Sequence, residues 1–263
     1  MRTAHAAFSM SLVGDTGFVL LALPAAAYGS DDRISVTLDG EPVEWSIEPA
    51  AHDTRELRFS AGAGRLDVDI RSTLTHLQRP VADGDPARYL QDSRYVEASA
   101  LRGFVDERFG RASGFEQIDA MRNWIARGFT YEPSLSVIDD SAVSTLAKSG
   151  GMCRDYTHVM TALARAAGIP ARYVGVYAPG LVPPDFHAVT EVFIDDDWWV
   201  VDATGLAPRG SLIRIATGAD ALETAWATTT GSSVRLMSLT VDAEDDGLPE
   251  GTVDDPRQRY RIL

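Results

Sequence analysis

The chain has 263 residues, of which 24 are Lys or Arg and 38 are Asp or Glu, so its formal net charge is −14. Hydrophobic residues make up 45% of the chain, which is typical of a globular protein and excludes a disordered one. The acidic balance argues against nucleic acid as a partner, and the single cysteine excludes an intramolecular disulfide or a four-cysteine metal cluster.

The N-terminal region, residues 1–80, is predicted to be rich in β-strands. Phe8, Met10 and Leu12 alternate with serines, which is the period of a strand with one buried face. Residues 14–17 carry a turn signal, and residues 18–23 are predicted to return as the second strand of a hairpin. Further alternating runs at residues 34–70 predict a small β-sandwich.

An alternative interpretation of the apolar run at residues 17–27 is a signal peptide. Arg2 is the only early positive charge and Asp15 interrupts the apolar pattern, so the sequence favours strands. No apolar run is long enough to span a bilayer, and we therefore predict a cytoplasmic protein with no membrane partner.

A second domain is predicted over residues 81–241, after a linker at 79–88 that is rich in Pro, Asp and Gly. Its helices are predicted at 96–109, 115–127 and 153–167, and its strands at 171–177, 188–194, 198–203 and 234–241. Residues 242–263 are predicted to form an acidic, solvated tail, in which Arg257, Arg259 and Arg261 pair locally with nearby carboxylates. Together these elements predict an α+β fold.

Cys153 follows two glycines and opens a predicted helix. Free N–H groups and the helix dipole stabilise an anion at this position, which favours a reactive thiolate. The alternative is a small buried side chain, which describes most free cysteines. Position alone leaves both interpretations open.

A thiolate nucleophile needs a histidine partner. His158 is five residues further along the same helix, about 140° around its axis, and is expected to be a packing or surface residue. His187 opens a strand behind a proline-rich loop and is the better candidate.

Asp202 ends the next strand and is the candidate for orienting the imidazole. If the hairpin between the two strands has a two-residue turn, residues 189 and 202 face each other directly. His187 is then the diagonal neighbour of Asp202, within reach of its side chain. The acids at 195–197 allow a calcium-binding alternative, but they lack a full ligand loop, and we expect neither a metal nor a cofactor.

The order of Cys, His and Asp along a helix and two strands resembles the transglutaminase-like superfamily of papain-like thiol enzymes. The resemblance covers residues 95–215. It is carried by GMCRDYTH at 151–158, GIPARYV at 168–174, DFHAVTEVF at 185–193 and WWVVDAT at 198–204. Val189 and Ala203 depart from the pattern, which has an aromatic residue and a proline at these places.

The resemblance implies a papain-like core, in which the nucleophile's helix packs on an antiparallel sheet after a β-rich region. It also implies roles for Cys153 as nucleophile, His187 as general base and acid, and Asp202 as orienting residue. The expected substrate is a peptide or protein, and the expected activity is that of a protease or amidase. Acyl transfer to amines and non-catalytic peptide binding are the alternatives. The backbone N–H of Cys153 and one side chain, for which Tyr131 is the candidate, would hold the oxyanion.

Overall fold

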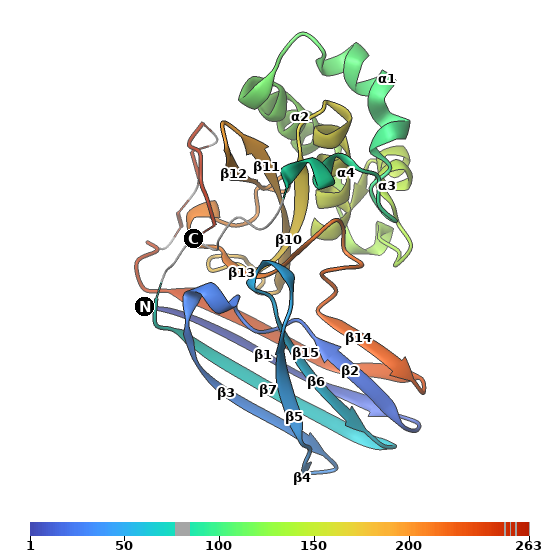
Figure 1. Cartoon of the computed structure of the whole chain (residues 1–263), viewed down its shortest axis with the longest axis vertical. Coiled ribbons are helices and arrows are strands. Elements are labelled where there is room, and N and C mark those ends of the chain that lie inside the picture. The colour runs from blue at the N-terminus through green and yellow to red at the C-terminus, as the bar shows by residue number, and fades with distance from the viewer. Residues whose placement is uncertain (77–84, 250, 253, 256, 263) are drawn as a thin grey trace.

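The computed structural model describes residues 1–76, 85–249, 251–252, 254–255 and 257–262. The chain forms a β-sandwich and, next to it, a four-stranded sheet covered by helices (Figure 1). Most of the predicted linker at 79–88 lies outside the described residues.

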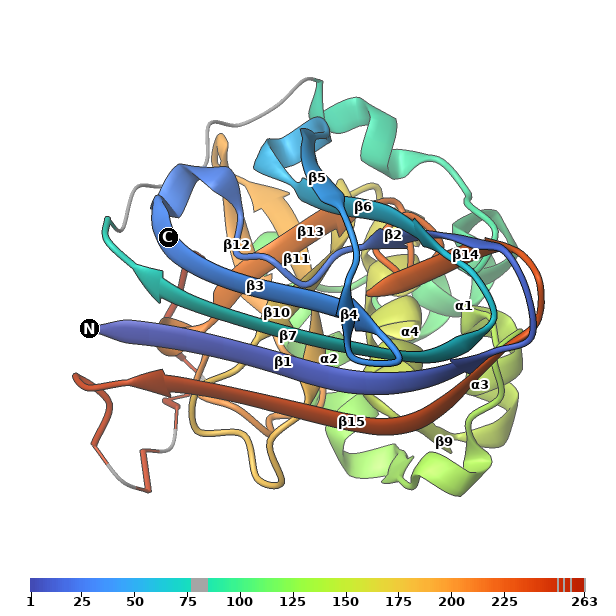
Figure 2. The same ribbon diagram turned by 90° about the horizontal axis from the view of Figure 1, so that it is seen from below.

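The sandwich consists of two antiparallel sheets. Within the described residues, one sheet has the order β15-β1-β7-β3-β4 and the other β14-β2-β6-β5. Their bounds are β1 Arg2–Leu12, β2 Thr16–Leu20, β3 Ser30–Leu38, β4 Glu41–Pro42, β5 Trp45–Pro49, β6 Arg55–Ala61, β7 Gly64–Leu74, β14 Ala227–Gly231 and β15 Val234–Asp245. Figure 2 shows β3, β7, β1 and β15 side by side.

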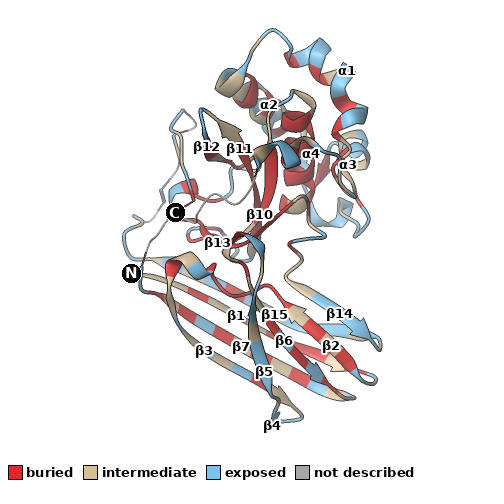
Figure 3. Ribbon diagram, in the orientation of Figure 1, coloured by how far each residue is buried: buried red, intermediate tan, exposed pale blue. Residues whose placement is uncertain are grey.

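Alternation along the strands builds the core of the sandwich. On β1, Phe8, Met10 and Leu12 are buried, as predicted. On the neighbouring strand β7, Val68 lies opposite Phe8 and Leu66 lies opposite Met10. Buried and exposed bands therefore alternate along these strands (Figure 3). The same core continues into the four-stranded sheet, which contributes Tyr177, Ile213 and Ile215.

The predicted hairpin between the first two strands is wrong. β1 pairs with β7 and β15, whereas β2 pairs with β6 and β14 in the opposite sheet. The turn after Leu12 therefore carries the chain from one sheet to the other. An alternating pattern identifies a strand with one buried face, but it does not identify the partner strand.

The chain returns to the sandwich after the helical part. β15 pairs with β1 along its whole length, with His5 opposite Asp242 and Arg2 opposite Asp245. The predicted boundary at residue 241 thus falls inside a strand, and the acidic residues 242–245 belong to a sheet and not to a solvated tail.

The helical part contains a sheet with the order β12-β11-β10-β13 among the described residues. Its elements are α1 Ala98–Phe109, α2 Gly114–Gly128, β8 Thr130–Tyr131, α3 Ala142–Lys148, β9 Gly150–Gly151, α4 Cys153–Ala166, β10 Ala171–Tyr177, β11 Phe186–Ile194, β12 Asp197–Val201 and β13 Ile213–Gly218. The three predicted helices are present within two residues of their expected ends, whereas α3 and β13 were not predicted. None of the described helices is both long and apolar enough to cross a membrane.

The long helix α4 lies on the sheet and is fixed there by buried hydroxyl groups. Thr157 donates to the carbonyl of Ala188 at 2.9 Å, and the hydroxyls of Thr161 and Thr190 are 3.0 Å apart. These contacts hold α4 along β11, which brings the first turn of the helix to the start of that strand.

The last described residues pack against the helical part. Arg259 forms a bidentate ion pair with Asp119 on α2, and Arg261 lies 2.7 Å from Asp197. The expected local pairing of these two arginines with the acidic tail is therefore wrong. The backbone of Tyr260 accepts a hydrogen bond from the N–H of Val200, which extends the edge of the sheet.

Candidate active site

Cys153 is the first residue of α4, and the segment just before the helix contains two glycines. Gly150 and Gly151 form β9, which pairs in parallel with β8. Gly151 has a φ of +151°, and a Cβ there would lie 2.5 Å from the carboxylate of Asp155. That carboxylate accepts a hydrogen bond from the backbone of Met152 at 2.9 Å and is completely buried. Asp155 is therefore an acid that caps the start of the helix.

His187 lies on β11, and Asp202 directly follows the end of the neighbouring strand β12. A two-residue turn of Asp195 and Asp196, both with positive φ, joins β11 and β12. The register places Thr190 opposite Val201, and one step further residue 189 faces residue 202. The predicted diagonal arrangement is confirmed: Nε2 of His187 lies 3.0 Å from Oδ2 of Asp202, and both side chains are buried.

The second carboxylate oxygen of Asp202 is held by Thr204. Oδ1 accepts from the backbone N–H of Thr204 at 2.8 Å and from its hydroxyl at 2.7 Å. Burial disfavours the charged carboxylate, but His187 and the two Thr204 hydrogen bonds outweigh it and lower the pKa of Asp202. Sequence reasoning missed Thr204, although an Asp followed two residues later by Thr at a strand end is typical of an Asx turn.

The imidazole of His187 lies between the carboxylate and the thiol. Its Nε2 faces Asp202, and the ring also interacts with the Cys153 side chain. Burial disfavours the charged ring, but the Asp202 carboxylate and the contact with Cys153 prevail and raise the pKa of His187 to about 10. The ring therefore carries a proton at neutral pH.

The surroundings of Cys153 are apolar on one side and open to Tyr131 on the other. The thiol is buried among Tyr173 and Ala188, with Ala221 packed beside them. Tyr131, on β8, pairs with Gly151 and lies near enough to Cys153 for the two side chains to interact electrostatically. Burial and the nearby Cys153 raise the pKa of Tyr131, so its hydroxyl keeps its proton and can donate.

His158 is a packing residue and not a surface residue. Its ring is completely buried between Tyr95 and Tyr173, and Nε2 accepts the backbone N–H of Ala221 at 3.3 Å. Burial lowers the pKa of His158 to about 4, so the ring is neutral. His158 thus fixes the loop that follows β13 next to Cys153, a role that the sequence did not indicate.

Trp198, Trp199 and Val189 lie outside the candidate triad of Cys153, His187 and Asp202. Trp198 packs edge-on against Tyr89, and Trp199 packs in the same way against Phe115. Val189 is buried in a core cluster and not in an open pocket wall. The described residues contain no group of three or more His, Cys, Asp or Glu side chains arranged to hold a metal ion.

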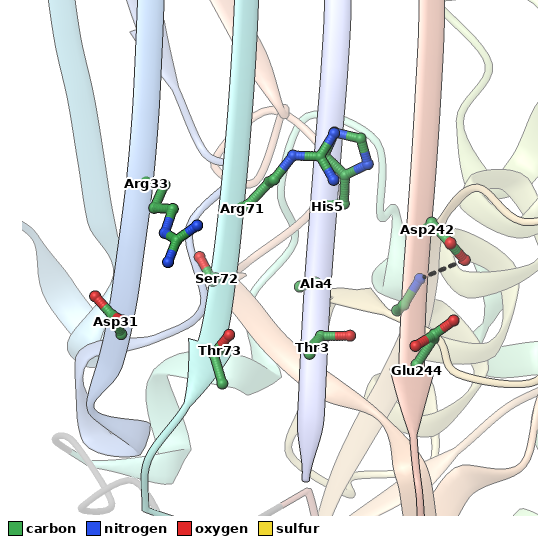
Figure 4. A pocket seen from close by; sticks show the side chains of 11 residues that line it. Thr3, Ala4, His5, Asp31, Arg33, Arg71, Ser72, Thr73, Asp242 and Glu244 are labelled. Atoms are coloured by element: carbon green, nitrogen blue, oxygen red, sulfur yellow. Dashed lines mark hydrogen bonds between the residues drawn. The ribbon is translucent and has the colours of Figure 1, made fainter.

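Two cavities have contrasting positions. One of about 320 Å³ lies behind the triad, where Asp202 forms part of its wall with Arg122 and Arg209. Another of about 390 Å³ lies on the outer face of the sandwich, between β3, β7, β1 and β15 (Figure 4). Two of its lining residues pair with Asp69 on β7: His5 from the neighbouring strand and Arg71 from the same strand. Cys153, His187 and Asp202 do not line this cavity.

Comparison with known proteins identifies the class of protein that this site and fold define. Residues 104–203 match the family model described as the transglutaminase-like superfamily, and this segment contains Cys153, His187 and Asp202. Residues 104–203 are therefore a transglutaminase-like segment of the chain.

One solved structure extends the match beyond residues 104–203. The structure of a candidate cysteine protease from Cytophaga hutchinsonii is 26% identical, with a TM-score of 0.83 over 97% of this chain and 94% of that chain. The periplasmic domain of TgpA from Pseudomonas aeruginosa is 21% identical, with a TM-score of 0.40 over 75% of this chain and 91% of that one. The uncharacterized protein ML0607 of Mycobacterium leprae is 26% identical over 108 residues. That match spans 41% of this chain and 39% of the relative.

The first comparison bears on the architecture. Because it covers nearly all of both chains, the sandwich and the helical part occur together in the Cytophaga hutchinsonii structure too. The predicted α+β fold, with a transglutaminase-like core after a β-rich region, is confirmed.

Proposed function

We propose that the protein is a thiol hydrolase that cleaves peptide or amide carbonyls with Cys153 as nucleophile. The observation that carries the proposal is the buried His187 ring, which lies 3.0 Å from Asp202 and interacts with Cys153 at the start of α4. A protonated imidazole beside the sulfur and the free N–H groups of a helix start both favour the thiolate.

The first half of the proposed reaction forms a thioester. The thiolate of Cys153 attacks the carbonyl carbon, and the carbonyl electrons move to oxygen. We assign the stabilisation of that oxyanion to the backbone N–H of Cys153 and to the hydroxyl of Tyr131, whose raised pKa keeps its proton in place. The imidazolium of His187 then gives its proton to the leaving amine as the carbon–nitrogen bond breaks.

The second half uses water. His187, now neutral, takes a proton from the water molecule that attacks the thioester. The carbon–sulfur bond breaks, the acid product leaves, and the thiolate–imidazolium pair is restored. Asp202 keeps its charge throughout and stabilises the imidazolium, with its second oxygen fixed by Thr204.

To test hydrolysis, the wild-type enzyme is incubated with a peptide library and a labelled primary amine. New carboxyl termini support hydrolysis, whereas transfer of the label to the peptides in preference to cleavage would replace hydrolysis by acyl transfer. Peptide binding without either product would favour a non-catalytic module. A Cys153→Ala variant is the control, because products that persist in that variant cannot come from this site.

The predicted location remains a proposal. Cys153 is the only cysteine and forms no disulfide, which supports a protein that works in the reducing cytoplasm. Determining the N-terminal residue of the protein in its own host would test that location.

A further inference from the structure

A loop beside the nucleophile exposes several large apolar side chains. It runs from Tyr131 to Ile138, between α2 and α3. Leu135 is 41% exposed, Val137 56% and Ile138 78%. Neighbouring exposed apolar side chains are a feature of surfaces that bind a ligand or partner.

The backbone of this loop is fixed although its side chains are exposed. The buried carboxylate of Asp140 accepts the N–H of Val137 at 2.7 Å. The guanidinium of Arg154 donates to the carbonyl of Val137 and to the hydroxyl of Ser136, and Lys148 donates to the carbonyl of Leu135 at 3.3 Å. Polar contacts therefore hold the backbone of the loop in place while its apolar side chains stay exposed to solvent.

The same contacts join the loop to the nucleophile. Arg154 directly follows Cys153, and the Leu135 side chain lies over Gly150, where an added Cβ would be 2.8 Å from it. At the other end of the loop, Tyr131 pairs with Gly151 on β9, two residues before Cys153. The exposed apolar side chains thus border the place where a substrate carbonyl must lie.

We propose that residues 131–138 form a subsite that binds a large aliphatic or aromatic side chain of the substrate peptide, close to the scissile bond. This inference rests on the proposed function, because it places the peptide carbonyl at Cys153. Val137 and Ile138 are its specificity-determining residues. A preformed apolar subsite needs no ordering of the loop on binding, so burial of the substrate side chain translates into affinity and selectivity.

Binding is measured on the Cys153→Ala protein, which does not turn over substrate. Two pools of fluorescent hexapeptides are compared by anisotropy, identical except that Leu, Ile and Phe in the first pool are replaced by Ser in the second. We expect the apolar pool to bind about tenfold more tightly. In a Val137→Ser/Ile138→Ser background the difference should fall below about twofold, since polar side chains no longer bury the ligand.

The matched control is Leu236→Ser/Met237→Ser on β15, where two side chains of similar exposure lie on the sandwich. It should keep the tenfold preference. An unchanged preference in the loop variant, or a preference lost in the β15 control, would overturn the subsite. Cleavage by the wild-type enzyme is followed separately, so a protein that binds apolar peptides but never cleaves them contradicts the proposed function and not the affinity measurement.

Discussion

Nε2 of His187 and Oδ2 of Asp202 are 3.0 Å apart in an environment almost closed to solvent. The contact depends on the two-residue turn at Asp195 and Asp196, because a turn one residue longer would move the Asp202 side chain to the other face of the sheet. The short hairpin thus sets the geometry of the proposed base.

Replacing Asp202 by Asn removes the negative charge and leaves a side chain of the same shape. The amide cannot stabilise the imidazolium, and we expect kcat for peptide hydrolysis to fall on the order of 10³-fold or more. Circular dichroism should show an intact fold. The companion variant Thr204→Val, which loses one of two hydrogen bonds to Oδ1, should cost only about tenfold. Equal rates in wild type and Asp202→Asn would remove Asp202 from the triad.

Replacing Cys153 by Ala should abolish hydrolysis, since no other cysteine can supply the sulfur. The side chain is small and sits at the edge of its cluster, so we expect the free energy of unfolding to change by only about 1 kcal/mol. Product formation is followed by mass spectrometry and stability by urea titration. Residual hydrolysis at the wild-type rate would show that another group attacks the substrate.

Because the pKa of His187 is raised to about 10, the free energy of unfolding should fall at alkaline pH. The unfolded chain releases this proton near pH 6.5, whereas the folded protein retains it to about pH 10. The imidazolium therefore stabilises the fold fully below pH 6.5, and this contribution is lost as the pH rises to about 10. We expect the free energy of unfolding to decline over this window, and to decline less in His187→Gln. Identical pH slopes for the two proteins would contradict the ion pair.

His158 should make the free energy of unfolding depend on pH in the opposite direction, at acid pH. Its pKa of about 4 lies below that of the unfolded chain, so between pH 6.5 and 4 protons bind preferentially to the unfolded state. Stability is therefore lost as the pH falls through this window, by about 3 kcal/mol at the lower end. Urea titrations at pH 7 and pH 4.5 should show a smaller difference for His158→Gln than for wild type. His5→Gln on the sandwich is the control and should behave like the wild type.

Sequence patterns predicted correctly those elements that depend on interactions between residues close together in the chain. The apolar spacing placed α2 and α4 within two residues, and the strand period with a short turn gave the diagonal of His187 and Asp202. Hydrogen bonds and packing between distant segments could not be read in the same way. Nothing in the pattern of β15 indicates that it pairs with β1, more than 200 residues away.

The surroundings of the nucleophile show the same division. Cys153 and its helix start follow from two glycines and a helical pattern. The position of His158 depends on the backbone N–H of Ala221, which comes from a loop 63 residues later. A sequence pattern gives the face of a helix on which a histidine lies, but not which loop packs over it.

Replacing Gly151 tests how closely the segment before Cys153 is packed against the start of α4. Its φ is +151°, and a Cβ at this position would lie only 2.5 Å from the Asp155 carboxylate, which leaves no room for a side chain. In Gly151→Ala the Asp155 carboxylate must move and lose its bond to the Met152 backbone, so we expect a loss of about 2 kcal/mol in stability and a lower kcat. Gly103→Ala is the matched control, because a Cβ at Gly103 meets nothing within 4 Å. In the middle of α1 this change should raise stability by about 0.5–1 kcal/mol and leave kcat unchanged. If Gly151→Ala were as stable and as active as Gly103→Ala, the helix start would not need the close contact between Gly151 and Asp155.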